Sequence, residues 1–178
     1  MPERIHRLSA DPDHPWLTVA DPADQERLES LLSGRPMGAE WTPLAMRIDD
    51  AGPEGRSAEL TDFPRVGCPV PVFSRRAADA LRDLLLPHGE LLPLAGVPCV
   101  AFNVTTVLDA LDEQRSKLIR HAGRVMQVRR FELRPEALGA PVFRLASIVR
   151  SDPFVTEEFR ERVLAAGLTG VTTKPVWP

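Results

Sequence analysis

Residues 71–94, PVFSRRAADALRDLLLPHGELLPL, decide the fold class, because a short apolar strand leads directly into a capped helix and then into a second strand. Ser74 is a favoured N-cap residue. The apolar residues after it recur with the spacing of one helix face: Ala77, Ala80, Leu81, Leu84 and Leu85. Pro87 and Gly89 end the predicted helix, and the apolar runs at 91–94 and 99–104 predict two strands.

Residues 142–177 repeat this order of strand, cap and helix. VFRLASI (142–148) predicts a strand, and Thr156 is expected to cap a helix whose first turn carries two acidic residues. Gly167 is a favoured residue at the helix C-terminus, and a final strand is expected at 171–177. The helix should bury Phe159, Val163 and Ala166 and form an ion pair between Glu158 and Arg162.

The window 99–134 contains no proline and admits two interpretations. In one, a helix carries a single apolar stripe made of Val104, Leu108, Leu111, Leu118 and Ala122. In the other, a short helical turn at 107–112 precedes a hairpin of 116–121 and 124–133 that turns at Gly123. The hairpin is favoured because VMQVRRFEL (125–133) is rich in β-branched and aromatic residues.

Residues 1–62 are interpreted as an acidic, proline-rich N-terminal lobe or arm, since ten of the 18 prolines lie within 1–71. Strands are expected at 4–8 and 16–19, and a helix from Asp21 and Pro22 to about Leu32. The run 41–48 predicts an edge strand, because Pro43 cannot donate to a ladder. We therefore expect one compact α+β domain with a mixed or antiparallel central sheet, about three helices, and its core in 63–178.

Composition sets the broad class. The chain has 178 residues, of which 43% are hydrophobic and 26% charged, as is typical of a single globular domain. The N-terminus MPERIHRLSADPDHP has no apolar signal region, and no stretch approaches the about 18 apolar residues of a membrane span. We expect a cytoplasmic protein without a membrane partner. Cys68 and Cys99 lack metal-type spacing, and Cys99 is expected to be a free buried thiol.

Charge is distributed unevenly along the chain. Residues 1–62 carry 13 acidic and 6 basic residues, whereas 63–178 carry 12 acidic and 16 basic ones. The excess acid gathers in a glycine- and proline-containing stretch, which suits a solvated loop that steers a basic partner. The candidate partner-binding residues are Asp49, Asp50, Glu54, Glu59 and Asp62, with Trp41 as an aromatic anchor. No basic run is interleaved with aromatic residues, so a nucleic-acid partner is disfavoured.

No motif indicates catalysis, a metal site or a cofactor. The sequence contains no glycine-rich phosphate loop, no GxSxG elbow and no HExxH spacing. The best metal guess, His6 and His14 with the acids of the DPDHP turn, is more typical of an ordinary polar turn. Asp109 and Asp112 are expected to cap and solvate a helix end rather than act as paired catalytic carboxylates. We therefore predict a protein that is not an enzyme and holds neither metal nor cofactor.

Several segments resemble one bacterial family. The strands LLPL and CVAFNV, the pattern FNVxxxxDALDxxxS (102–116), the expected hairpin, VFRL, and the closing VTEEFRERVLAAGLTGV (155–171) resemble the myxobacterial-type immunity proteins of bacterial polymorphic toxin systems. The resemblance covers about residues 60–177. Where members often carry tyrosines before the Asn-Val pair, this chain has Val100, Ala101 and Phe102.

The resemblance implies a function by binding. Members of this family are inferred to neutralise a cognate toxin encoded beside them by occluding its site, and the family offers no catalytic residues to carry over. The alternative is a small-ligand-binding protein or an enzyme, whose sign would be a pocket that gathers His88 or His121 with Asp109 or Asp112. A structural assembly module is a third possibility. The sequence names neither the toxin nor an oligomeric state.

Overall fold

The computed structural model describes residues 3–49 and 59–178. Within these residues the chain forms four α-helices: α1 (Gln25–Ser30), α2 (Arg75–Ala80), α3 (Arg82–Leu85) and α4 (Glu157–Ala165). It also forms thirteen strands: β1 (Ile5–Ala10), β2 (Trp16–Val19), β3 (Leu44–Asp49), β4 (Arg65–Val66), β5 (Val72–Ser74), β6 (Gly89–Ala95), β7 (Cys99–Val104), β8 (Val107–Leu108), β9 (Lys117–His121), β10 (Arg124–Arg130), β11 (Val142–Leu145), β12 (Phe154–Thr156) and β13 (Val171–Trp177). The predicted α+β class is confirmed.

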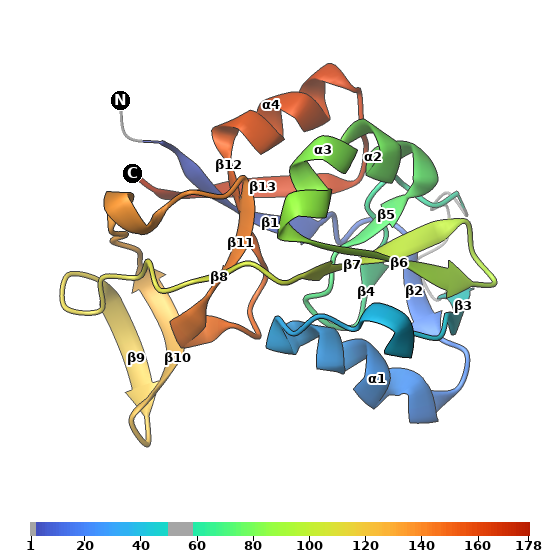
Figure 1. The fold of residues 1–178 in the computed structure, drawn as a ribbon, viewed down its shortest axis with the longest axis horizontal. Coiled ribbons are helices and arrows are strands. Elements are labelled where there is room, and N and C mark those ends of the chain that lie inside the picture. Colours follow the sequence, from blue (N-terminus) through green and yellow to red (C-terminus); the bar gives the residue numbers. More distant parts are fainter. Residues whose placement is uncertain (1–2, 50–58) are drawn as a thin grey trace.

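The strands form two main sheets rather than the one central sheet that we predicted. One sheet has the order β13-β1-β12-β11-β8 and the other the order β4-β2-β3-β6-β7-β5; both are mixed. A separate two-stranded ribbon, β9-β10, projects at one end of the molecule (Figure 1). The single-sheet prediction was wrong because β1 pairs with β12 and β13 from the other end of the chain. The residue pattern of a strand does not indicate which distant strand it pairs with.

Strands from the N-terminal part of the chain belong to both main sheets. Strand β1 lies inside the five-stranded sheet between β12 and β13, whereas β2 and β3 belong to the six-stranded sheet. Ile5 of β1 is fully buried. The proline-rich composition of this region reflects its many connections rather than a loose attachment.

Strand β3 also corrects a prediction. We expected an edge strand because of Pro43, but β3 is paired on both sides, antiparallel to β2 and parallel to β6. The strand begins at Leu44, after the proline, so the missing amide hydrogen of Pro43 falls outside the ladder.

The helix caps follow the sequence closely. The Ser74 side chain accepts from the backbone N–H of Ala77, and Thr156 accepts from that of Phe159. The helix predicted after Ser74 is divided into α2 and α3 at Leu81. The predicted ion pair within α4 does not form: Arg162 instead binds Asp83 of α3, with an Nη1 to Oδ1 distance of 2.8 Å.

The hairpin interpretation of 99–134 is confirmed. Strands β9 and β10 pair antiparallel across a two-residue turn, Ala122 and Gly123, and both turn residues have positive φ. Such a turn matches the twist of paired strands. The predicted helical turn at 107–112 is wrong, because Val107 and Leu108 form β8, which pairs in parallel with β11.

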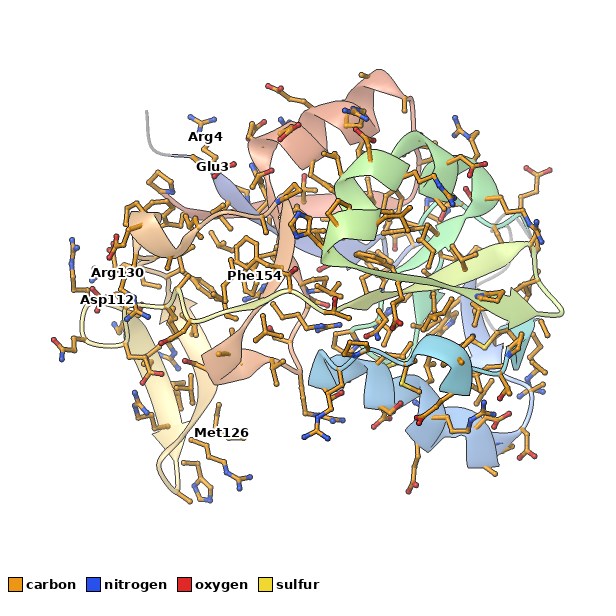
Figure 2. The ribbon with its side chains drawn as sticks, in the orientation of Figure 1. Glu3, Arg4, Asp112, Met126, Arg130 and Phe154 are labelled. Carbon is orange, nitrogen blue, oxygen red and sulfur yellow. The ribbon has the colours of Figure 1, made fainter. Side chains whose placement is uncertain are left out.

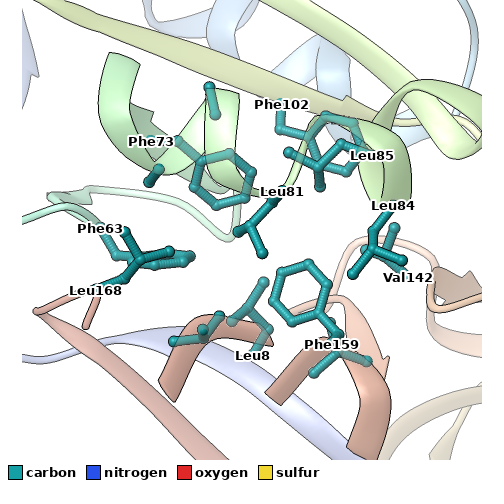
Figure 3. Close-up of a cluster of buried hydrophobic side chains, with 14 of the residues drawn as sticks. Leu8, Phe63, Phe73, Leu81, Leu84, Leu85, Phe102, Val142, Phe159 and Leu168 are labelled. Carbon is teal, nitrogen blue, oxygen red and sulfur yellow. The ribbon is translucent and has the colours of Figure 1, made fainter. Parts of the chain in front are cut away.

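Three apolar clusters hold the layers together. The first lies between the two sheets and helices α2, α3 and α4, with Phe73, Phe102 and Phe159 at its centre (Figure 3). The second joins α1 to one face of the six-stranded sheet, and the third lies beneath β8, β11 and the base of the hairpin. Because β1 and β11 each contribute side chains to two clusters, the five-stranded sheet is covered on both faces.

Candidate interaction surfaces

Trp41, the predicted aromatic anchor, makes contacts within the fold. Its indole N–H donates a hydrogen bond to the carbonyl oxygen of Pro93 in β6, at 3.0 Å. The ring is half-buried and packs against the apolar cluster under α1. Trp41 therefore fastens the loop before β3 to the sheet, and its indole N–H is already used.

Asp62 is likewise internal, which contradicts our expectation of an exposed loop residue. Its side chain is buried at 7% exposure. The carboxylate accepts hydrogen bonds from Ser74 Oγ at 2.7 Å, from the Thr169 backbone N–H at 3.0 Å, and from the Arg76 guanidinium. Burial raises the pKa of the Asp62 carboxyl, but the bonds from Ser74, Thr169 and Arg76 outweigh that effect and leave the pKa below its ordinary value. Asp62 joins the start of α2 to the loop after α4.

Of the remaining acidic candidates, two lie at the surface and two lie outside the described residues. Asp49 ends β3 and is half-exposed, and Glu59 is exposed where the described chain resumes. Asp50 and Glu54 lie outside the described residues. Asp49 and Glu59 therefore lie at the surface, Trp41 is half-buried with its indole N–H bonded to Pro93, and Asp62 is buried.

Trp16 is the aromatic residue that sequence reasoning missed. It begins β2, is 38% exposed, and lies opposite Asp49 in the β2–β3 register, so the two side chains share one face of the sheet. The guanidinium of Arg65 on neighbouring β4 stacks over the indole, 4.9 Å from the ring centroid. A signal was present in the alternation of WLTV, which places Leu17 and Val19 inward and Trp16 outward.

A second candidate surface is the groove between the β9–β10 hairpin and residues 146–152. Its volume is about 720 Å³. Met126 of β10 borders it and is 63% exposed; Figure 2 shows this residue on the projecting hairpin, with Arg130 near the other end of the same strand. Four arginines line the groove, Arg7, Arg120, Arg124 and Arg150, together with two acids, Glu113 and Asp152.

Arg144 lies buried behind this groove. Its Nη1 donates to the carbonyl oxygens of Val149 at 3.0 Å and Ser151 at 2.6 Å, and its Nη2 donates to that of Pro69 at 3.1 Å. Burial lowers the pKa of Arg144 to about 10, so the side chain stays charged at neutral pH. Arg144 thus fixes the segment 149–151 as a wall of the groove.

The residues that would mark an enzyme do not come together. His88 Nδ1 contacts Thr106 Oγ1 at 3.1 Å, whereas His121 is exposed at the hairpin turn. Asp109 forms an ion pair with Arg134, and Asp112 accepts from the backbone of the turn after it. Neither of the two described cavities is lined by any of His88, His121, Asp109 or Asp112.

The two histidines of the predicted metal site contact different acidic residues and do not form one cluster. His6 Nε2 lies 2.6 Å from the Glu157 carboxylate, and His14 lies 3.5 Å from Asp11. Among residues 3–49 and 59–178, no group of three or more metal-ligating side chains gathers. Both cysteines are free in this part of the chain, and burial raises the pKa of each thiol to about 11.

The residues that carry the family resemblance have structural roles. Asn103, buried in β7, donates from Nδ2 to the Arg35 carbonyl and to the Glu90 carboxylate, each at 2.8 Å. Glu90 in turn accepts from the backbone N–H groups of Met37 and Gly38. This network fastens the loop after α1 to the six-stranded sheet.

Comparison with known proteins gives no further assignment: neither the models of known protein families nor the curated proteins contain a match to this chain. None of the helices in the described part of the chain has both the length and the apolar character that a bilayer span requires.

Proposed function

We propose that the protein is an immunity protein that binds a cognate bacterial toxin domain, encoded nearby, and neutralises it by occluding its site. The proposal places the protein in the cytoplasm of the producing cell. The resemblance of residues 60–177 to the myxobacterial-type immunity family supports it.

The observation that carries the proposal is the exposed Trp16, which shares one face of the six-stranded sheet with Asp49. Tryptophan and arginine are the residue types most enriched in binding hot spots, and here Arg65 holds the indole of Trp16 in place. Asp49 lies opposite Trp16, and in the sequence the stretch 49–59 that begins with it contains four acidic residues and one arginine. An aromatic anchor beside a charged segment suits recognition of a basic protein, since charge speeds encounter and the ring supplies apolar contact.

The structure changes which residues we assign as the aromatic anchor and as the acidic contacts. In our prediction Trp41 was the anchor and all five acids faced the partner. The contacts of Trp41 and Asp62 favour assigning the anchor to Trp16 and leaving Asp62 to the fold.

The direct test is to produce the product of the neighbouring gene with and without this protein. We expect the wild-type chain to restore growth to cells that make the toxin and to form a stoichiometric complex in titration calorimetry. Trp16→Ala should weaken binding at least tenfold, and Trp16→Phe should recover part of the loss. A neighbouring product that neither harms cells nor binds would refute the function.

Charge is tested by a matched pair of double variants. Asp49→Asn with Glu59→Gln should slow association by about threefold at low salt, with little effect at high salt. Asp79→Asn with Asp109→Asn removes the same net charge from exposed acids of other elements and should leave the rate unchanged. Equal effects of the two pairs would remove the acidic segment from the interface.

A further inference from the structure

We infer that the groove between the β9–β10 hairpin and residues 146–152 binds an acidic, extended segment of a partner protein. This inference rests on the proposed function only for the identity of the partner, which would then be the toxin. The groove lies at the end of the molecule opposite β2 and β3 (Figure 1), so it is separate from the Trp16 surface.

The first argument is charge. Four arginines line the groove against two acids. Arg120 pairs with Glu113 and Arg150 pairs with Glu29 outside the lining, which leaves Arg7 and Arg124 against Asp152. Glu113 binds Arg120 and accepts from Ser147 Oγ at 2.6 Å, and Asp152 accepts from Ser9 Oγ at 3.2 Å. Unengaged cationic groups in a groove favour carboxylates, which arginine can bind through two parallel hydrogen bonds.

Two of the arginines carry this charge without an acidic partner among the described residues. Arg124 begins β10, is exposed, and has no ion pair there. Arg7 lies over the Phe131 ring, 5.6 Å from its centroid, and its Nε is a buried donor without an acceptor.

The second argument is the apolar lining. Met126 of β10 is exposed in the lining, and the half-buried Val125, Ile148 and Val149 also line the groove. Exposed apolar surface rimmed by charge is typical of a protein-binding surface. Among the described lining residues there is no aromatic ring on which a base could stack, which favours a peptide over single-stranded nucleic acid.

The third argument is that the groove is preformed. Glu113 joins Arg120 of β9 to Ser147 on the opposite wall, so one carboxylate sets the separation of the two sides. Arg144 fixes the 149–151 wall from behind. Within the described residues β9 and β10 pair only with each other, which leaves strand edges to which an extended segment can add.

The probe is a library of random ten-residue peptides displayed on phage. It is selected on the wild-type protein and counter-selected on the double variant R124E/M126D. We expect enrichment of glutamate and aspartate together with leucine, isoleucine or valine. Failure to enrich any peptide, or enrichment of lysine and arginine, would overturn the inference.

Affinity of the enriched peptides is then measured by fluorescence anisotropy on matched variants. R124E should weaken binding at least tenfold, whereas R129E should change it less than threefold. Arg129 is also exposed on β10 but does not line the groove, so the charge change is the same. If R124E does not fold, R124Q should still weaken binding at least threefold. Equal effects at positions 124 and 129 would refute the site.

Other occupants are distinguished in the same assay. A 20-nucleotide single-stranded DNA that binds more tightly than the peptides, and loses affinity in R124E, would make the groove a phosphate site and overturn the inference. The wild-type chain is also tested for self-association. If it self-associates and R124E abolishes this, the groove binds the acidic stretch of a second copy, which would also overturn the inference.

The toxin assay separates the two proposals. A toxin that binds wild type and R124E equally leaves the immunity function standing and removes the groove from that complex. A neighbouring product that does not bind at all refutes the function, while the peptide selection still decides whether the groove takes an acidic segment.

Discussion

Replacing Asp62 by alanine should destabilise the protein strongly, although this residue lies in the most acidic part of the sequence. The change removes the acceptor for Ser74 Oγ, for the Thr169 backbone N–H and for the Arg76 guanidinium. It therefore loosens the start of α2 and the loop after α4 together, at the border of the first apolar cluster.

The magnitude follows from which partners can regain water. A hydrogen bond to a charged group contributes about 1.5–3 kcal/mol, and these contributions are not additive. Arg76 is 57% exposed, so its guanidinium can be rehydrated once the carboxylate is gone. The hydrogen bonds from the Thr169 amide and the Ser74 hydroxyl are part-buried, and we expect a total loss of about 3 kcal/mol in the free energy of unfolding. With a urea dependence of about 2 kcal/mol per molar, the unfolding midpoint falls by about 1.5 M.

The assay is urea unfolding of wild type and variant at several pH values. Since the pKa of Asp62 is lowered in the folded protein, its stabilising effect is present above the ordinary value of 3.8 and is lost as the pH falls through the folded-state pKa. The gap between wild type and Asp62→Ala should therefore be full at pH 7 and narrow below about pH 4. Asp79→Asn, an exposed acid on α2, should change stability by less than about 0.5 kcal/mol. A loss below about 1 kcal/mol for Asp62→Ala would mean that the carboxylate is solvated, as the sequence first suggested.

Three further outcomes check the fold and the site. Phe159→Ala should cost about 3–5 kcal/mol because the ring is fully buried, whereas Leu164→Ala on the exposed side of the same helix should cost less than about 1 kcal/mol in urea unfolding. Asn103→Ala should cost about 2 kcal/mol and increase amide hydrogen exchange at residues 35–38, and protection that stays unchanged would contradict the network. Cys68 and Cys99 should react slowly with iodoacetamide at pH 8 in intact-mass measurements, because burial raises the pKa of both thiols to about 11.

The helix caps and the hairpin turn could be predicted from the sequence. Ser74, Thr156 and Gly167 act at helix ends as expected, because a cap is decided by a few neighbouring residues. The hairpin turn at Gly123 was predictable for the same reason.

The division of the strands into two main sheets could not be predicted from local sequence. Strand β1 pairs with β13, more than 160 residues later, and nothing in IHRLSA selects that partner over β2. Binding candidates failed for a related reason. Composition treats Asp62 and Glu59 alike, but only Asp62 meets the start of α2 and the Thr169 loop, and that meeting depends on the tertiary fold.

The Trp16 surface and the hairpin groove allow charge changes of opposite sign, and this gives a way to separate local contacts from overall charge. Asp49, which the charge test combines with Glu59, ends β3 toward one end of the long axis, and Arg124 begins β10 on the hairpin at the other end (Figure 1). Neutralising the two acids makes the whole protein more positive, whereas Arg124→Gln makes it more negative. If only net charge mattered to a partner, these changes would act in opposite directions. If each surface meets a complementary part of the partner, both changes weaken binding, and the combined variant loses the sum of the two effects because sites this far apart do not couple.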